Sequence, residues 1–252
     1  MTGVNQPRKQ ITLAPFVFGE ILLRENPNPT LDRLNQFDIR FGLEVGETIK
    51  SIATLSEDEM PKFKPFVNPD FVKHYGRFYS GLTSPTDKHK EWARATKDGH
   101  RDFCADMAKR TPLAREKLRN GGIRVPKFRD LDDALEQTPS FQDLVVNSIT
   151  NGGERETRIA NAAALYRAVM ANPFLSRMWR SILFSLVSWA RQWQDQKLNF
   201  DPAAKRDDWV DMTLPLYAEQ GDVILTADAK LKLLIAVVEP SGVVTTGNAV
   251  SF

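Results

Sequence analysis

Residues 221–238 read GDVILTADAKLKLLIAVV, and the predicted fold class depends mainly on this stretch. Residues 223–226 form a short apolar run that is typical of a strand in a parallel sheet covered on both faces. Residues 230–238 then predict a helix, and residues 243–246 predict another strand. A strand, a helix and a strand in this order indicate a parallel α/β arrangement.

The N-terminal end of the chain predicts the same alternation. Residues 10–14 are expected to form a strand, and Pro15 opens a helix, a position where its missing N–H costs nothing. That helix ends before the turn-forming sequence NPNP at residues 26–29. A short helix, a strand with side chains alternating between two faces, and another helix are expected at 31–36, 38–45 and 46–55.

The middle of the chain, residues 56–199, has little strand pattern and is rich in helix-forming residues. Proline, glycine and Asn-Gly clusters divide it into an expected five to seven helices. Because the α/β pattern resumes afterwards, we interpret this block as an insertion between residues 1–55 and 200–252. The expected fold is a three-layer α/β structure, with a parallel sheet, helices on both faces and a large helical insertion.

The overall composition restricts the class of protein. The 34 basic and 32 acidic side chains give a net charge of only +2, so any case for nucleic-acid binding depends on where the charges lie. The single cysteine, Cys104, cannot form an internal disulfide, which is typical of a reducing compartment. The most apolar run, near residues 182–190, is about half the length that a membrane span needs. We therefore expect a cytoplasmic protein without a membrane anchor or secretory signal.

Three acidic residues lie where ordinary packing does not favour a charge. Glu20 is inside an apolar predicted helix, Asp211 is inside the apolar stretch 209–214, and Asp228 follows the strand at 223–226. Carboxylates that converge repel one another, and Mg²⁺ or Mn²⁺ relieves the repulsion because these ions prefer oxygen ligands. Simpler explanations remain open, because Asp211 can face solvent and Glu20 can pair with Arg24.

Asp208 lies three residues before Asp211 and shares its helical face. It is either an auxiliary metal ligand or a favourable charge in the first turn of a helix predicted over 207–218.

These segments resemble the PIN-domain nucleases. The sequence from Ile11 through Glu20 is similar to the second strand and following helix of that family, and residues 208–231 are similar to its C-terminal half. The resemblance places Glu20, Asp211 and Asp228 on metal-binding acids and Thr226 on a hydroxyl beside the metal. It implies an Mg²⁺- or Mn²⁺-dependent ribonuclease, and an antitoxin-like protein as one potential partner.

One feature departs from the family pattern. PIN domains begin with a strand that ends in an aspartate, and here no acid precedes Glu20. Either the given chain starts downstream of that strand or the strand is lost. The alternative function is therefore a non-catalytic or N-terminally truncated module that binds RNA or acts as a regulator.

A basic stretch at residues 101–129 carries nine basic and three acidic side chains. Such a surface can follow a phosphate backbone, although a solvated helix face explains it equally well. The RNA-binding residues expected from it are Arg110, Arg115, Arg119 and Lys127. Trp179, Trp189 and Trp193 lie among aliphatic residues, so we expect them to be buried and not to stack on bases. The sequence leaves homo-oligomer formation open.

Overall fold

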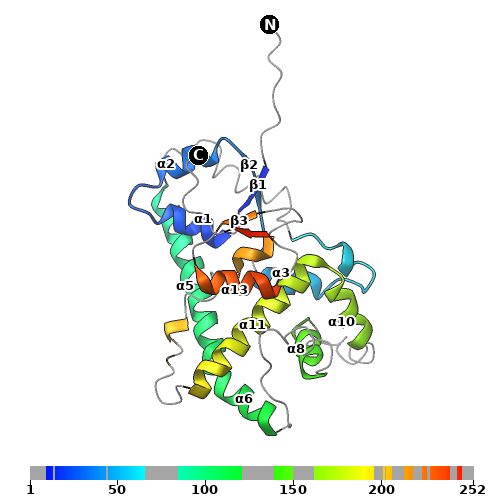
Figure 1. The fold of residues 1–252 in the computed structure, drawn as a ribbon. Coiled ribbons are helices and arrows are strands. Elements are labelled where there is room, and N and C mark those ends of the chain that lie inside the picture. Colours follow the sequence, from blue (N-terminus) through cyan, green and yellow to red (C-terminus); the bar gives the residue numbers. More distant parts are fainter. Residues whose placement is uncertain are drawn as a thin grey trace. The chain divides into compact units, whose positions relative to one another are not determined.

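The computed structural model describes residues 10–13, 15–43, 45–65, 85–120, 139–149, 162–195, 201, 203–205, 213–217, 223–225, 228–238 and 243–245. The chain divides into two compact units. Unit 1 contains residues 1–44 and 65–99, and unit 2 contains residues 45–64 and 100–252. Helix α5 (Asp87–Lys109) contributes residues to both units. Figure 1 labels the elements along the chain.

Unit 1 begins with a parallel β-α-β arrangement. Strand β1 (Gln10–Leu13) pairs with β2 (Asp38–Phe41) from Gln10 opposite Asp38 to Leu13 opposite Phe41. Helices α1 (Pro15–Leu22) and α2 (Asn28–Leu34) connect the two strands. As the sequence predicts, α1 starts at Pro15 and ends before the proline-rich turn.

The core of unit 1 forms where α1 packs on the first half of α5. The buried side chains are Leu13, Phe18, Ile21, Leu22, Leu31, Phe41 and Ala93. The ring of Phe18 meets Phe41 edge to face with centroids 5.7 Å apart, and it lies 6.1 Å from the ring of Trp92. Gly19 faces Ala93 of α5, and a Cβ at this position would lie 3.6 Å from Ala93, an ordinary packing distance.

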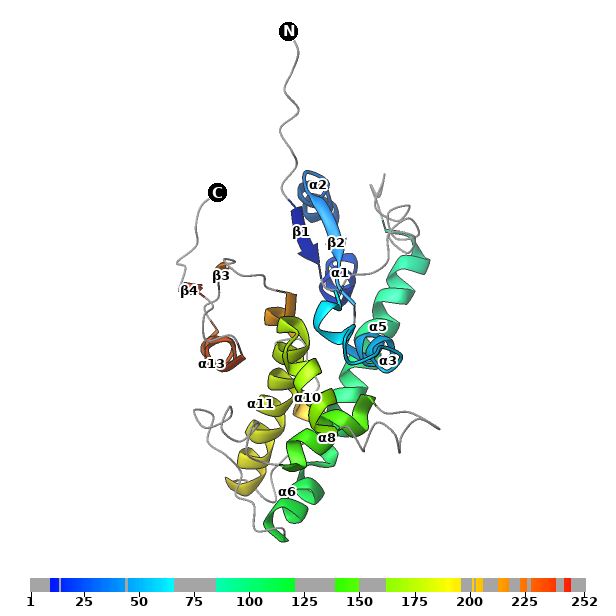
Figure 2. The same cartoon turned by 90° about the vertical axis from the view of Figure 1, so that its right-hand side faces the viewer.

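Unit 2 is mainly helical and is arranged around α11 (Pro173–Asp195). In Figure 2, α11 lies between α13 on one side and α8 and α10 on the other. Its described residues also form short 3-10 helices and a pair of strands, and they include the second half of α5. The other elements of unit 2 in the described part of the chain are α3 (Val45–Ile52), η1 (Met60–Lys62), α6 (Thr111–Asn120), α8 (Pro139–Ile149), α10 (Ala162–Met170), η4 (Ala203–Lys205), η5 (Leu214–Tyr217), β3 (Val223–Leu225), α13 (Ala229–Val238) and β4 (Val243–Thr245).

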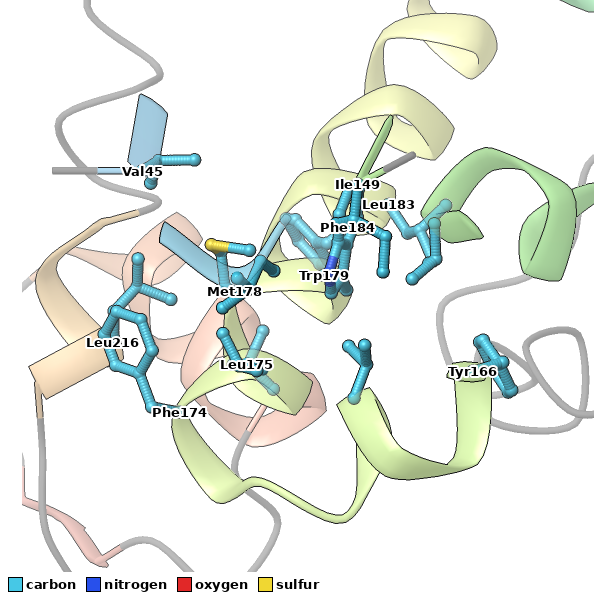
Figure 3. Close-up of a cluster of buried hydrophobic side chains, with 14 of the residues drawn as sticks. Val45, Ile149, Tyr166, Phe174, Leu175, Met178, Trp179, Leu183, Phe184 and Leu216 are labelled. Carbon is cyan, nitrogen blue, oxygen red and sulfur yellow. The ribbon is translucent and has the colours of Figure 1, made fainter. Parts of the chain in front are cut away.

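The core of unit 2 gathers around the buried face of α11. Figure 3 shows Trp179, Leu183 and Phe184 of α11 beside Ile149 of α8. Trp179 and Trp189 are each 2% exposed, which confirms that these two side chains are buried. The side chain of Trp193 lies outside the described residues. None of the described helices combines the length and apolar character that a membrane span requires.

The expected three-layer parallel sheet is wrong. Within the described residues, the strands form two separate parallel pairs, β1–β2 and β3–β4, and helices dominate. The individual strands are close to their predicted positions, because short apolar and alternating runs identify strands locally. Their assembly into one sheet does not follow, because the pairs belong to different units. The second predicted strand also ends early, since Val45 instead begins α3 and is buried.

The two compact units divide the chain at different places from the expected insertion at 56–199. Residues 65–99 belong with the N-terminal strands, whereas residues 45–64 belong with the large helical core. Within the block 56–199, the described residues contain α5, α6, α8, α10, α11 and the short η1. Its predicted helical character is therefore confirmed in that part of the chain.

Candidate functional site

Glu20 lies on the partly exposed side of α1. The neighbouring residues Phe18, Ile21 and Leu22 are buried in the unit 1 core, so this side of α1 packs against that core. The Oε1 atom of Glu20 accepts a hydrogen bond from Lys97 Nζ of α5 at 3.1 Å, forming an ion pair. The side chains of Glu20 and Lys97 are 42% and 33% exposed, so solvent reaches both groups.

The ion pair of Glu20 is thus made across two helices and not along α1. The side chain of Arg24, the partner suggested by its spacing of four residues, instead donates from Nη1 to Thr30 Oγ1 at 3.5 Å. Lys97 is 77 residues away from Glu20 in the sequence. No local pattern reveals such a distant partner, so the sequence does not predict this ion pair.

Asp228 is exposed and lies between β3 and α13. Its Oδ1 atom accepts a hydrogen bond from the backbone N–H of Leu231 at 2.8 Å. A side-chain oxygen that accepts from the first turn in this way is an N-terminal helix cap. Asp228 comes three residues after the carboxyl end of β3, which pairs in parallel with β4. Open parallel sheets bind ligands at this edge.

The remaining predicted metal-site residues, Asp208, Asp211 and Thr226, lie outside the described residues. Glu20 belongs to unit 1, whereas Asp228 belongs to unit 2. Within the described part of the chain, no three or more histidine, cysteine, aspartate or glutamate side chains are grouped to hold a metal ion. The chemistry of Glu20 and Asp228 still suits a hard cation, because both offer carboxylate oxygens to solvent.

The predicted RNA-binding residues are only partly described. Arg110 is exposed in the turn between α5 and α6. Arg115 and Arg119 lie within α6, but their side chains, like the whole of Lys127, are outside the described residues. Near Arg110, Lys109 forms an exposed ion pair with Asp106 at 3.0 Å. Acidic neighbours therefore offset part of the positive charge at the end of α5.

No family model, no curated protein and no solved structure matches the chain. No relative therefore helps to assign a role to these residues.

Proposed function

We propose that this protein is a metal-dependent phosphodiesterase that hydrolyses RNA. Asp211 and Asp228, with Asp208 as an auxiliary ligand, would hold Mg²⁺ or Mn²⁺. Glu20, the other acid that the sequence predicts for a metal site, belongs to unit 1 and is not counted among these ligands. A bound divalent ion supplies an activated water and stabilises negative charge that develops on a phosphate. The proposal concerns the chemistry of these carboxylates and does not depend on a three-layer sheet.

The position of Asp228 is the observation that carries the proposal. It is exposed, and it comes three residues after the end of β3, the strand that pairs in parallel with β4. Asp228 already accepts a hydrogen bond from Leu231, which restrains its carboxylate. Support for Asp211 comes from its sequence context and from the resemblance to PIN-domain nucleases.

A binding role without hydrolysis is the second candidate, and the ion pair of Glu20 favours it. The ammonium group of Lys97 already balances the negative charge of Glu20 at 3.1 Å. A carboxylate with such a partner has no electrostatic need for a divalent ion. In this case the protein binds RNA and leaves it intact.

Cleavage of a mixed single-stranded RNA pool in Mn²⁺ distinguishes these functions. The parent protein is compared with Asp211→Asn and Asp228→Asn. Asparagine at position 228 keeps an oxygen that can cap α13, so the fold is expected to persist. Asp201→Asn is the matched control, because Asp201 is also exposed and its Oδ1 accepts a local hydrogen bond from Ala203 N–H at 2.9 Å.

If RNA is hydrolysed at the proposed site, the parent and Asp201→Asn cleave RNA. Asp211→Asn and Asp228→Asn then do not cleave it. Equal activity in all four proteins would refute the assigned residues. A folded but inert parent refutes hydrolysis by this chain. RNA binding by that inert parent, measured separately in EDTA, then supports the second candidate.

A further inference from the structure

Helix α5 carries the chain from unit 1 into unit 2 without a break. It runs from Asp87 to Lys109, and the boundary between the two units falls between Gly99 and His100. Figure 1 shows α5 as one continuous helix. Each half of this helix therefore belongs to a different compact unit.

The two halves of α5 are held by different contacts. In the first half, Ala93 is fully buried in the unit 1 core, and Lys97 pairs with Glu20 of α1 at 3.1 Å. In the second half, Ala105 and Ala108 are buried, and Ala108 belongs to the unit 2 core. Positions 97 and 105 are separated by about 12 Å of helix, from a rise of about 1.5 Å per residue.

The turn between these contacts is open to solvent. Asp98, Gly99 and Asp102 are exposed, and Arg101 is half-buried. A Cβ at Gly99 would meet no atom within 4 Å outside its own stretch of helix. Most of the stability of a helix in a protein comes from tertiary packing. Packing therefore stabilises this turn less than it stabilises the halves on either side.

The sequence of this turn also favours a helix less than its surroundings do. Residues 96–102 read TKDGHRD, in which only the lysine and the arginine are good helix formers. Glycine is the least favourable of the seven in a helix interior, because it loses the most backbone freedom. The flanking segments 91–95 and 103–109 instead contain alanine, the best helix former, at positions 93, 95, 105 and 108. Low helix propensity and low burial thus coincide at the boundary between the units.

The other two connections between the units leave unit 1 at one place. The chain passes from unit 1 to unit 2 between residues 44 and 45, and it returns between residues 64 and 65. The backbone N–H of Leu43 donates to the carbonyl oxygen of Pro65 at 2.7 Å, which ties the two connections together. Two connections that share one place can act as a pivot, so they do not prevent α5 from bending.

We propose that residues 98–102 of α5 form a hinge between unit 1 and unit 2. The backbone hydrogen bonds of this turn open and close while both halves of α5 stay in their own cores, and the two units change orientation as it opens. Hinges consist of a few residues that absorb a large backbone change, and compact units within one chain commonly move in this way. The hinge is independent of the chemistry proposed for the carboxylates.

Hydrogen exchange along α5 tests whether this turn opens by itself. Exchange of the full chain is followed by mass spectrometry with fragmentation that resolves single residues. Amides at 99–102 should exchange faster than those at 91–95 and 105–108, because local opening exposes them without unfolding either core. Gly99→Ala should slow exchange at 99–102 about fivefold, from the difference in helix propensity between glycine and alanine, and leave both flanks unchanged. Uniform exchange along α5 in the parent would overturn the hinge.

A second variant separates the hinge from the effect of glycine alone. Gly99→Ala/Ala95→Gly moves the glycine by about one helical turn, to an exposed position in the half that packs on α1. The buried Ala93 and the ion pair of Lys97 should keep exchange at 91–95 slower than exchange at 99–102 in the parent. Equal rates at these two places would assign the opening to glycine and not to the boundary, and would also overturn the hinge.

Spin labels test whether the two units change orientation. One pair joins Asn35→Cys in unit 1 to Arg167→Cys in unit 2, and the control pair joins Arg110→Cys to Arg167→Cys within unit 2. All three labelled positions are exposed, and Cys104→Ser removes the native thiol. Double electron–electron resonance should give a broader distance distribution for the pair that spans the units, and Gly99→Ala should narrow it. Equal widths for the two pairs in the parent would show that the units do not turn, which refutes the proposal.

Discussion

Asn172 offers the sharpest test of how unit 2 is held together. It is 2% exposed and lies immediately before α11. Its Oδ1 accepts hydrogen bonds from the backbone N–H groups of Phe174 and Leu175, at 3.0 and 3.2 Å. Its Nδ2 donates to the carbonyl oxygens of Met60, Pro61 and Phe63, at 3.0, 3.3 and 2.8 Å. One side chain thus caps α11 and ties it to η1.

Asn172→Ala removes both functions. Loss of an N-terminal cap costs about 1–2 kcal/mol. Loss of the amide donor removes at least two well-formed buried hydrogen bonds, each worth about 1 kcal/mol net. Met60 O keeps another partner, the backbone N–H of Phe63 at 3.1 Å, which limits the penalty at that oxygen. We therefore expect the free energy of unfolding to fall by about 3–4 kcal/mol.

Two further variants separate the contributions. Asn172→Ser keeps an oxygen that can cap α11 but lacks the amide donor, so about 2 kcal/mol should be lost. Asn35→Ala is the control, because Asn35 is an exposed asparagine at the end of α2 whose own N–H, and not its side chain, makes the cap contact. Surface changes of this kind usually stay within about 0.5 kcal/mol.

The assay is urea unfolding, followed by tryptophan fluorescence and circular dichroism. Trp179 and Trp189 report on unit 2, since both are buried in its helical core. If the free energy of unfolding of Asn172→Ala is within about 0.5 kcal/mol of that of Asn35→Ala, the hydrogen bonds of Asn172 do not hold α11 to η1.

Two more predictions concern α5. Burial lowers the pKa of His89, whose Nδ1 accepts a hydrogen bond from Thr86 N–H at 2.9 Å. As the pH falls, His89 is therefore protonated in the unfolded chain at a higher pH than in the folded protein. The stability contributed by neutral His89 is present above about pH 6.5 and declines as pH falls towards the lower folded pKa. Urea unfolding from pH 8 to pH 5 should show a shallower pH dependence in His89→Gln, and an unchanged slope contradicts this role. Separately, Gly99→Ala should raise the free energy of unfolding by about 0.5–1 kcal/mol, because a Cβ at position 99 would meet nothing within 4 Å beyond its own turn of helix. Thermal unfolding checks this, with Gly19→Ala as a more crowded comparison; a less stable Gly99→Ala protein contradicts the prediction.

Local sequence patterns predict the individual helices and strands and much of what is buried. Pro15 at the start of α1, the apolar run of β3 and the helix that follows it are found where their patterns predict. Trp179 and Trp189 are buried because aliphatic residues at helical spacing surround them in the sequence. These features depend on residues a few positions apart, so the local pattern contains the necessary information.

Contacts between residues that are distant in the sequence are not visible in these local patterns. Strand patterns did not reveal two separate pairs in two units, because an apolar strand can pair with any strand that the chain brings to it. The partner of Glu20 is 77 residues away, and the carbonyl groups bound by Asn172 are more than 100 residues away. Such contacts depend on how whole helices pack, and packing is set by the summed fit of many side chains and not by any single motif.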